Sequence, residues 1–258
     1  MSAGHHRSHH GLYLDQGSPV HGLPAAAKVA GLVLYVVSVA LTPRTAVAAL
    51  AANAVVVAAV VVLARLPVRT VITRAAAVLP FVAFAFVLPF VATGERTPVL
   101  GISVAVDGLW ATWNIVAKAF LGATAGLVLT ATTRVPDLLA GLGRLRVPAV
   151  VVAIVAFMLR YLELVVDEFG RMRRAMLARA YAPRWIWEAK PVASSVGTLF
   201  VRTYERGERV HQAMVARGFK GVLPPPVGEP SATLGSTLGA LVPGVLAAGL
   251  LAASLLAR

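Results

Sequence analysis

The chain contains two copies of one short sequence, AMLARAY at positions 175–181 and AMVARGF at positions 213–219. Four positions are identical, and the other three keep their class: branched aliphatic, tiny and aromatic. An arginine precedes each copy at the same distance, Arg171 in the first and Arg209 in the second, with an acid four residues further back. Spacings of four place side chains on one face of a helix. Each copy is therefore predicted to be an amphipathic helix that presents arginine beside small residues.

The composition is that of an integral membrane protein. Of the 258 residues, 58% are apolar and 14% are charged, whereas soluble domains carry about 25% charged residues. Apolar runs of ~17–25 residues, the length of a membrane-spanning helix, recur along the chain. The chain has no cysteine, which excludes disulfides and thiolate metal sites. The first 24 residues are polar and lack the apolar core of a cleaved signal peptide, so we expect the N-terminus to be retained.

Hydropathy and charge together predict an all-α integral membrane protein. Four transmembrane helices come first, a cytoplasmic or interfacial helical region follows, and a C-terminal transmembrane helix closes the chain. The four parts are a cytoplasmic N-terminal tail (1–24), transmembrane helices 1–4 (25–131), the helical region with two Ala-Arg-small motifs (132–231) and the C-terminal transmembrane helix (232–258). The predicted spans are 25–41, 45–64, 75–92, 108–131 and 233–256.

Positive charge sets the predicted orientation. The net charge is +13, and residues 132–231 contain 15 of the 24 Lys and Arg. The connector at residues 65–74 contains three arginines and no acid. Cytoplasmic segments near spans carry the Lys and Arg excess, so both segments and the N-terminus are predicted to be cytoplasmic. No nucleic-acid-binding motif accompanies this charge, and we expect no nucleic-acid partner.

One ionisable residue falls inside a predicted span. Lys118 lies near the centre of the fourth span, where a lysine costs on the order of 3 kcal/mol and normally faces the bundle or a wet cavity. The first four spans contain no acid, so the candidate partners are Asn114, Asn53 or a group on another subunit. The alternative is a lysine that extends along its own stem to the outer interface. Lys118 and Asn53 are thus a candidate intramembrane polar site.

Residues 148–158 form an apolar stretch of only about eleven residues before Arg160. Such a stretch is short for a span. We expect it to form a helix packed under the bundle or at the interface.

The sequence contains no catalytic or metal-binding constellation. Neither a His-Glu-x-x-His helix nor a Gly-x-x-x-x-Gly-Lys phosphate loop occurs. Histidine pairs in the N-terminal tail suit a transition metal, or they belong to a disordered terminus. We expect a chain without catalytic activity, cofactor or metal site of its own. These tail histidines are His5, His6, His9 and His10.

The repeated arginines have two explanations. Small neighbours on both sides let a partner surface come close, and the planar guanidinium makes paired hydrogen bonds to carboxylates or carbonyls. Docking to a protein is therefore the favoured interpretation. A solvated basic helix, or a site for anionic lipid headgroups, is the alternative.

At these residues the sequence resembles the transmembrane T components of energy-coupling factor (ECF) transporters, and within them the CbiQ branch tied to cobalt and nickel uptake. Members carry two Ala-Arg-Gly motifs in cytoplasmic coupling helices. The second is intact here as Ala216-Arg217-Gly218, and the first reads Ala178-Arg179-Ala180. Further likeness lies in SPVH (18–21) with Lys28, TTR (132–134), FMLRY (157–161) and YERGERVH (204–211).

The resemblance implies a non-catalytic scaffold in the cell membrane, with residues 132–231 as its coupling-helix region. Two cytoplasmic ABC-type ATPase subunits would receive the two motifs in surface grooves, and Arg179 and Arg217 would each anchor one helix. Closure of the ATPases on ATP would move these helices and tip a separate substrate-binding (S-type) membrane subunit. That subunit would hold the cobalt or nickel ion.

Two rival hypotheses remain. A self-contained multi-pass permease or membrane-bound enzyme predicts polar groups that converge within the spans, of which Lys118 and Asn53 stand out. A structural or lipid-binding membrane protein predicts that the arginines act by charge alone, so that lysine would substitute for them.

Overall fold

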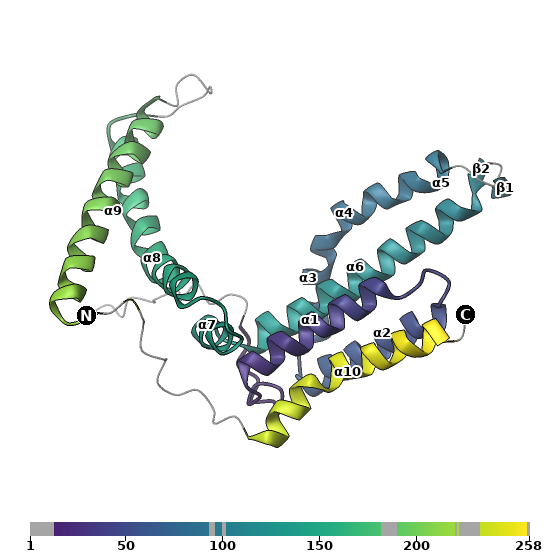
Figure 1. The fold of residues 1–258 in the computed structure, drawn as a ribbon. Coiled ribbons are helices and arrows are strands. Elements are labelled where there is room, and N and C mark those ends of the chain that lie inside the picture. The colour runs from purple at the N-terminus through teal and green to yellow at the C-terminus, as the bar shows by residue number, and fades with distance from the viewer. Residues whose placement is uncertain are drawn as a thin grey trace. The chain divides into compact units, whose positions relative to one another are not determined.

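The computed structural model describes residues 13–92, 96–99, 102–181, 190–219, 221 and 233–256. Apart from one short hairpin, the described elements are helices (Figure 1). The helices are α1 (Ala25–Leu41), α2 (Val47–Leu63), α3 (Val68–Ala75), η1 (Ala76–Val78), α4 (Leu79–Ala83), η2 (Phe84–Val87), α5 (Leu88–Val91), α6 (Val106–Thr132), α7 (Val135–Arg144), α8 (Ala149–Ala178), α9 (Lys190–Ala216) and α10 (Leu234–Leu256). The hairpin pairs β1 (Arg96–Val99) with β2 (Ile102–Ala105).

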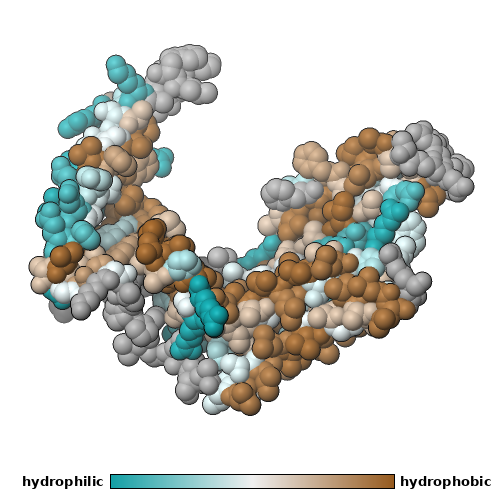
Figure 2. Space-filling view, in the orientation of Figure 1, coloured by the Kyte–Doolittle hydropathy of each residue, from teal (hydrophilic) through white to brown (hydrophobic). Residues whose placement is uncertain are grey.

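The structure is helical and includes long apolar helices, as the sequence predicts for an all-α membrane protein, and this fold class is confirmed. Three of them, α6, α8 and α10, are long and apolar enough to cross a membrane. The 17-residue helices α1 and α2 are shorter but also apolar. The space-filling view shows largely apolar side chains over the helices α1 and α10, whereas hydrophilic residues gather on α9 (Figure 2).

Contacts divide the chain into two compact units. The first comprises Met1–Leu145 with Pro226–Arg258, and the second comprises Arg146–Pro225. The amphipathic helix α7 belongs to the first unit, although the sequence analysis groups it with the basic region that begins at residue 132. Gly141 explains this placement, because a Cβ there would lie 2.7 Å from the backbone nitrogen of Ala26, at the start of α1.

Prolines break the third predicted span into short pieces. Pro80 and Pro89 each fall in the first turn of a new short helix, α4 and α5, with 3-10 turns between them. A proline lacks the N–H that would continue the ladder from the preceding turn, but it fits at a helix start. The third predicted span, residues 75–92, is therefore a series of short helical segments.

The segment between the third and fourth predicted spans comprises residues 93–107. Within it, residues 96–99 and 102–105 pair as antiparallel strands, with Arg96 opposite Ala105. Threonine, valine and isoleucine dominate these two segments, and such residues favour strands.

Helices α1, α2, α6 and α10 share one core. Its buried residues are Tyr35, Val39, Leu50, Val57, Leu121 and Ala247. Glycine allows the closest approach, between α1 and α10: a Cβ at Gly31 would lie 2.5 Å from the carbonyl oxygen of Ala240. The two backbones are thus in direct contact, as small residues permit in membrane helices.

Two lysines connect α1 and α6 reciprocally. Lys28 of α1 donates to the carbonyl oxygen of Thr132, the last residue of α6, at 3.1 Å. Lys118 of α6 donates to the carbonyl oxygens of Ala40 and Thr42, at the end of α1, at 2.8 Å each. The last carbonyls of a helix lack intrahelical donors and carry partial negative charge. Each lysine therefore caps the helix that the other lysine belongs to.

The segment before α1 folds over the end of α6 through His21. Its Nε2 donates to the carbonyl oxygen of Leu14 at 2.7 Å, and Nδ1 then accepts from the Ser18 hydroxyl at 2.6 Å. The amide of Leu14 donates to Ala131 at 3.0 Å, and Lys28 also donates to the carbonyl oxygen of His21 at 3.2 Å. Ser18, His21 and Lys28, which belong to the SPVH segment and its accompanying lysine, therefore hold the N-terminal segment in place.

The glycine contact between α1 and α10 yields a testable prediction. Gly31→Ala should lower the stability of the protein by about 1–3 kcal/mol, because the new methyl group overlaps the carbonyl of Ala240. Gly122→Ala is the matched control, since a Cβ at Gly122 of α6 meets nothing within 4 Å. Thermal unfolding in detergent micelles measures both. Equal unfolding midpoints for the two variants would contradict the packing.

Candidate functional site

The first motif copy ends helix α8 in a Schellman turn. Ala180 has a left-handed φ of 60°. The amide of Tyr181 donates to the carbonyl oxygen of Met176 at 3.1 Å, and the amide of Ala180 donates to that of Leu177 at 3.0 Å. This pair of bonds defines the turn and places Arg179 at the C-cap position.

The second copy ends α9 in the same way. Gly218 has a φ of 82°. The amide of Phe219 donates to the carbonyl oxygen of Met214 at 3.0 Å, and the amide of Gly218 donates to that of Val215 at 2.9 Å. Arg217 occupies the place that Arg179 has in the first copy. The alanine that replaces glycine in the first motif therefore leaves the geometry of the helix end unchanged.

Each copy of the repeated sequence contains partly buried residues that pack against the helix and exposed residues that face outward. Its methionine and aromatic residue, in both copies, are partly buried, as expected from the apolar contact that accompanies a Schellman turn. The residues between them are exposed in both copies: Ala178, Arg179 and Ala180, and Ala216, Arg217 and Gly218. Each copy thus presents an arginine between two small residues at an exposed helix end. The sequence predicts these arginines on a helix face and predicts Gly218 as the end of the second helix, but it does not predict the turn at Ala180.

The two motifs lie at opposite ends of an antiparallel hairpin. Met176, near the end of α8, accepts a hydrogen bond on its sulfur from Ser195, near the start of α9, at 3.6 Å. Phe157, early in α8, lines one pocket together with Met214 and Phe219 from the end of α9. At a rise of 1.5 Å per residue, the two arginines are roughly 35 Å apart along the hairpin.

Glu168 joins the two helices near the middle of the hairpin. It accepts hydrogen bonds from Arg171 of its own helix and from Arg202 of α9, the latter at 2.9 Å. Little else is buried here: α8 has no buried residue, and Leu199 is the buried residue of α9 in the described part of that helix. Few buried contacts therefore hold α8 and α9 together.

Helix α8 differs from the expected short helix at residues 148–158. It is continuous over 30 residues and is long and apolar enough to span a membrane. The predicted apolar stretch ends before Arg160, but aliphatic residues continue on both sides of Glu163 as far as Val166. Many of them are exposed, for example Ile154 at 60%. A partner or the bilayer must cover this surface.

The structure does not bring Lys118 and Asn53 together into a polar site. The Lys118 ammonium caps α1, as described above. Asn53 is fully buried in α2, where its Nδ2 donates to the carbonyl oxygen of Ala49 at 2.9 Å. The backbone carbonyl oxygen of Asn53 accepts a hydrogen bond from the Tyr35 hydroxyl at 3.1 Å. Asn114 is not the partner of Lys118 either, since its Oδ1 has no hydrogen-bond partner within the described chain.

The described residues hold no group of three or more His, Asp or Glu that would suit a metal ion. The tail histidines at positions 5, 6, 9 and 10 lie outside the described residues.

Comparison with known proteins matches residues 16–226 to the model of a family described as CbiQ, cobalt transport protein. The cobalt transport protein CbiQ of Rhodobacter capsulatus is 30% identical over 166 residues, which cover 61% of this chain and 63% of that protein. An uncharacterized protein of Methanocaldococcus jannaschii is 25% identical over 125 residues, which cover 46% of this chain and 41% of that protein. The chain thus spans less than two thirds of the length of either relative. The family match includes both arginine motifs.

The two helix ends offer a matched pair of substitutions. Ala180→Gly should stabilise the first turn by about 1 kcal/mol, because a left-handed backbone disfavours alanine but not glycine. Gly218→Ala should destabilise the second turn by about the same amount. Hydrogen exchange at the Tyr181 and Phe219 amides measures this, with roughly fivefold slower and faster exchange respectively. Unchanged exchange in both variants would contradict the two turns.

Lys118 can be tested for a structural or a transport role. Lys118→Met should destabilise the protein by about 1–3 kcal/mol, because two carbonyl oxygens at the end of α1 lose their donor. The thermal unfolding midpoint should fall, while metal uptake per folded protein stays unchanged. Loss of uptake with an unchanged midpoint would instead support a polar translocation site at Lys118.

Proposed function

The chain belongs to the CbiQ family of cobalt transport proteins, and we propose that it is the energy-coupling scaffold of an ATP-driven, ECF-type importer. Two ABC-type ATPase subunits bind its two arginine motifs, and a separate S-type membrane subunit holds the substrate. The substrate is cobalt or nickel. The chain itself carries out no catalysis.

The observation that carries this proposal is the pair of equivalent helix ends. Arg179 and Arg217 occupy the same position in the same turn, between small residues, and both are exposed. Two like surfaces on one hairpin suit two like partners. A separation of roughly 35 Å leaves room for one globular subunit at each end.

Guanidinium chemistry supports the choice of a protein partner. Arginine donates in a fixed planar fork to carboxylates or to carbonyl oxygens. Alanine and glycine beside it let a partner backbone come close, so the helix end can enter a groove on the ATPase. The negative end of the helix dipole lies at the same place, and donors on the partner can pair with the carbonyls that the turn leaves exposed.

The hairpin then transmits the movement of the ATPases. When the two ATPases close on ATP, they change the distance between the helix ends that they hold. Because the contact between α8 and α9 around Glu168 and Leu199 is small, the two helices can shift against each other. The exposed apolar side chains of α8 then convey this shift to the S-type subunit.

The proposed location is the cell membrane, with several spans and a cytoplasmic N-terminus. Charge supports this orientation. The ends of the spans that carry residues 65–74 and Arg134 are rich in arginine, whereas the described charges at the other end include an Arg44–Asp107 ion pair at 3.2 Å.

Purification from native membranes tests the proposal. An Arg179→Glu, Arg217→Glu double variant should lose at least about tenfold of the ATPase that copurifies with the parent protein, because each anchoring contact becomes repulsive. Arg173→Glu with Arg206→Glu is the matched control, since it changes one exposed arginine on each of the same helices outside the motifs. Equal ATPase recovery with both double variants would overturn the proposal.

A conservative substitution separates geometry from charge. Arg217→Lys keeps the charge but loses the planar fork, so ATPase recovery should fall severalfold. Recovery equal to that of the parent would favour a site that acts by charge alone, such as an anionic lipid surface.

A further inference from the structure

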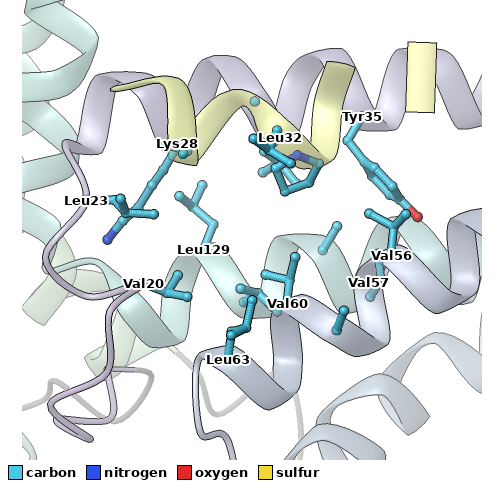
Figure 3. A pocket seen from close by; sticks show the side chains of 18 of the residues that line it. Val20, Leu23, Lys28, Leu32, Tyr35, Val56, Val57, Val60, Leu63 and Leu129 are labelled. Atoms are coloured by element: carbon cyan, nitrogen blue, oxygen red, sulfur yellow. The ribbon is translucent and has the colours of Figure 1, made fainter. Parts of the chain in front are cut away.

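An apolar groove of about 450 Å³ runs between α2 and α10 in the first unit. Helices α1 and α6 contribute its floor. In the close view, Leu23 and Lys28 lie at one end and Tyr35 lies at the other (Figure 3). Its lining includes Ala59 and Leu63 of α2, Val242 and Leu246 of α10, and Gly31 of α1.

The groove extends along about two thirds of one membrane leaflet. Lys28 and Tyr35 are seven residues apart on α1, so the groove extends roughly 10 Å along the helix. One leaflet contributes roughly 15 Å of hydrocarbon. The groove therefore follows the direction and most of the length of a lipid chain that lies beside the helices.

The groove opens laterally between helices that face lipid. Its walls include residues that are largely exposed, such as Val55 at 68% and Leu63 at 58%. Val57 of α2, which also lines the groove, shares the core with Ala247 of α10. An apolar groove left unfilled would lose dispersion contacts along its whole lining. In a bilayer, the group at hand to fill it is an acyl chain.

The end of the groove at Lys28 is basic. Lys28 donates to three acceptors there, the carbonyl oxygens of His21 and Thr132 and the hydroxyl of Thr133, so its ammonium supplies charge but no free donor. Arg65, two residues after the groove residue Leu63, is exposed and has a left-handed φ of 53°. Arg65 can therefore offer its full set of donors to a phosphate.

The acids at this end offset only part of this charge. Asp15 pairs with Arg134 at 3.6 Å, and Asp137, in the first turn of α7, interacts electrostatically with Lys28. The connector at residues 65–74 adds three arginines and no acid. Charge complementarity thus selects an anionic headgroup over a zwitterionic one.

We propose that this groove binds one acyl chain of an anionic phospholipid, whose phosphate contacts Arg65. With the orientation proposed above, the lipid belongs to the cytoplasmic leaflet. The site lies in the first unit, whereas the arginine motifs lie in the second. Lipid binding and ATPase coupling can therefore fail independently in experiment.

The test uses the full-length protein in nanodiscs made of equal parts phosphatidylglycerol and phosphatidylcholine. Native mass spectrometry counts the lipid retained on release. The parent should retain one phosphatidylglycerol, and Ala59→Phe, which fills the groove, should retain at least tenfold less. Ala58→Phe is the matched control, because Ala58 is an exposed neighbour that does not line the groove. Val242→Phe, with Leu238→Phe as its control, repeats the test from the opposite wall should Ala59→Phe fail to fold.

A headgroup arm tests the role of Arg65. Arg65→Gln should bring the retained phosphatidylglycerol and phosphatidylcholine to equal amounts, whereas Arg69→Gln should keep the preference of the parent. Equal retention by the groove-filling variants and their controls would overturn the proposal by showing annular lipid only. Equal retention of the two lipids by the parent would overturn its anionic selectivity. Absence of lipid from the parent, with a protein partner cross-linked to position 59 in native membranes, would assign the groove to that partner instead.

Discussion

The unpaired carbonyl groups at the ends of membrane helices are the constraint on which the first unit depends. In hydrocarbon no water is available to satisfy them. Lys28 and Lys118 supply the missing donors, each at the end of the helix that carries the other lysine. This arrangement fixes α1 and α6 as antiparallel neighbours at two depths. The core of α1, α2, α6 and α10 and the N-terminal segment held by His21 both build on that pair.

The second unit is organised on a different principle. Its hairpin buries little, and one ion pair at Glu168 crosses its middle. The backbone is instead well defined at the two helix ends, where a Schellman turn fixes the position of each arginine between small residues. Such a hairpin is well ordered at its two ends, where we propose that partners bind, and weakly packed between them. That combination suits a part that transmits movement rather than one that performs chemistry.

The sequence predicted the elements better than their interactions. The boundaries of α1 agree with its predicted span, because a proline and an apolar run define them. The partners of Lys118 were not predicted, because backbone carbonyls at a helix end leave no signal in side-chain identity. The turn at Arg179 was not predicted because Ala180 adopts a left-handed backbone conformation. Glycine at this position would have indicated such a turn in the sequence. The methionine and the aromatic residue, which recur in both copies of the repeat, are the sequence features that could have indicated the turn. Helix α8 was underestimated because isolated charges interrupt an apolar face without ending the helix.

We propose that the two helix ends hold two ATPase subunits at once. Site-specific photo-crosslinking from Ala178 and Ala216 in native membranes tests this proposal, since both positions are exposed beside the motif arginines. With a photoreactive residue at both positions of one chain, we expect a product that contains the chain and two ATPase subunits. Products with lipid alone, or with an ATPase from one position only, would contradict it.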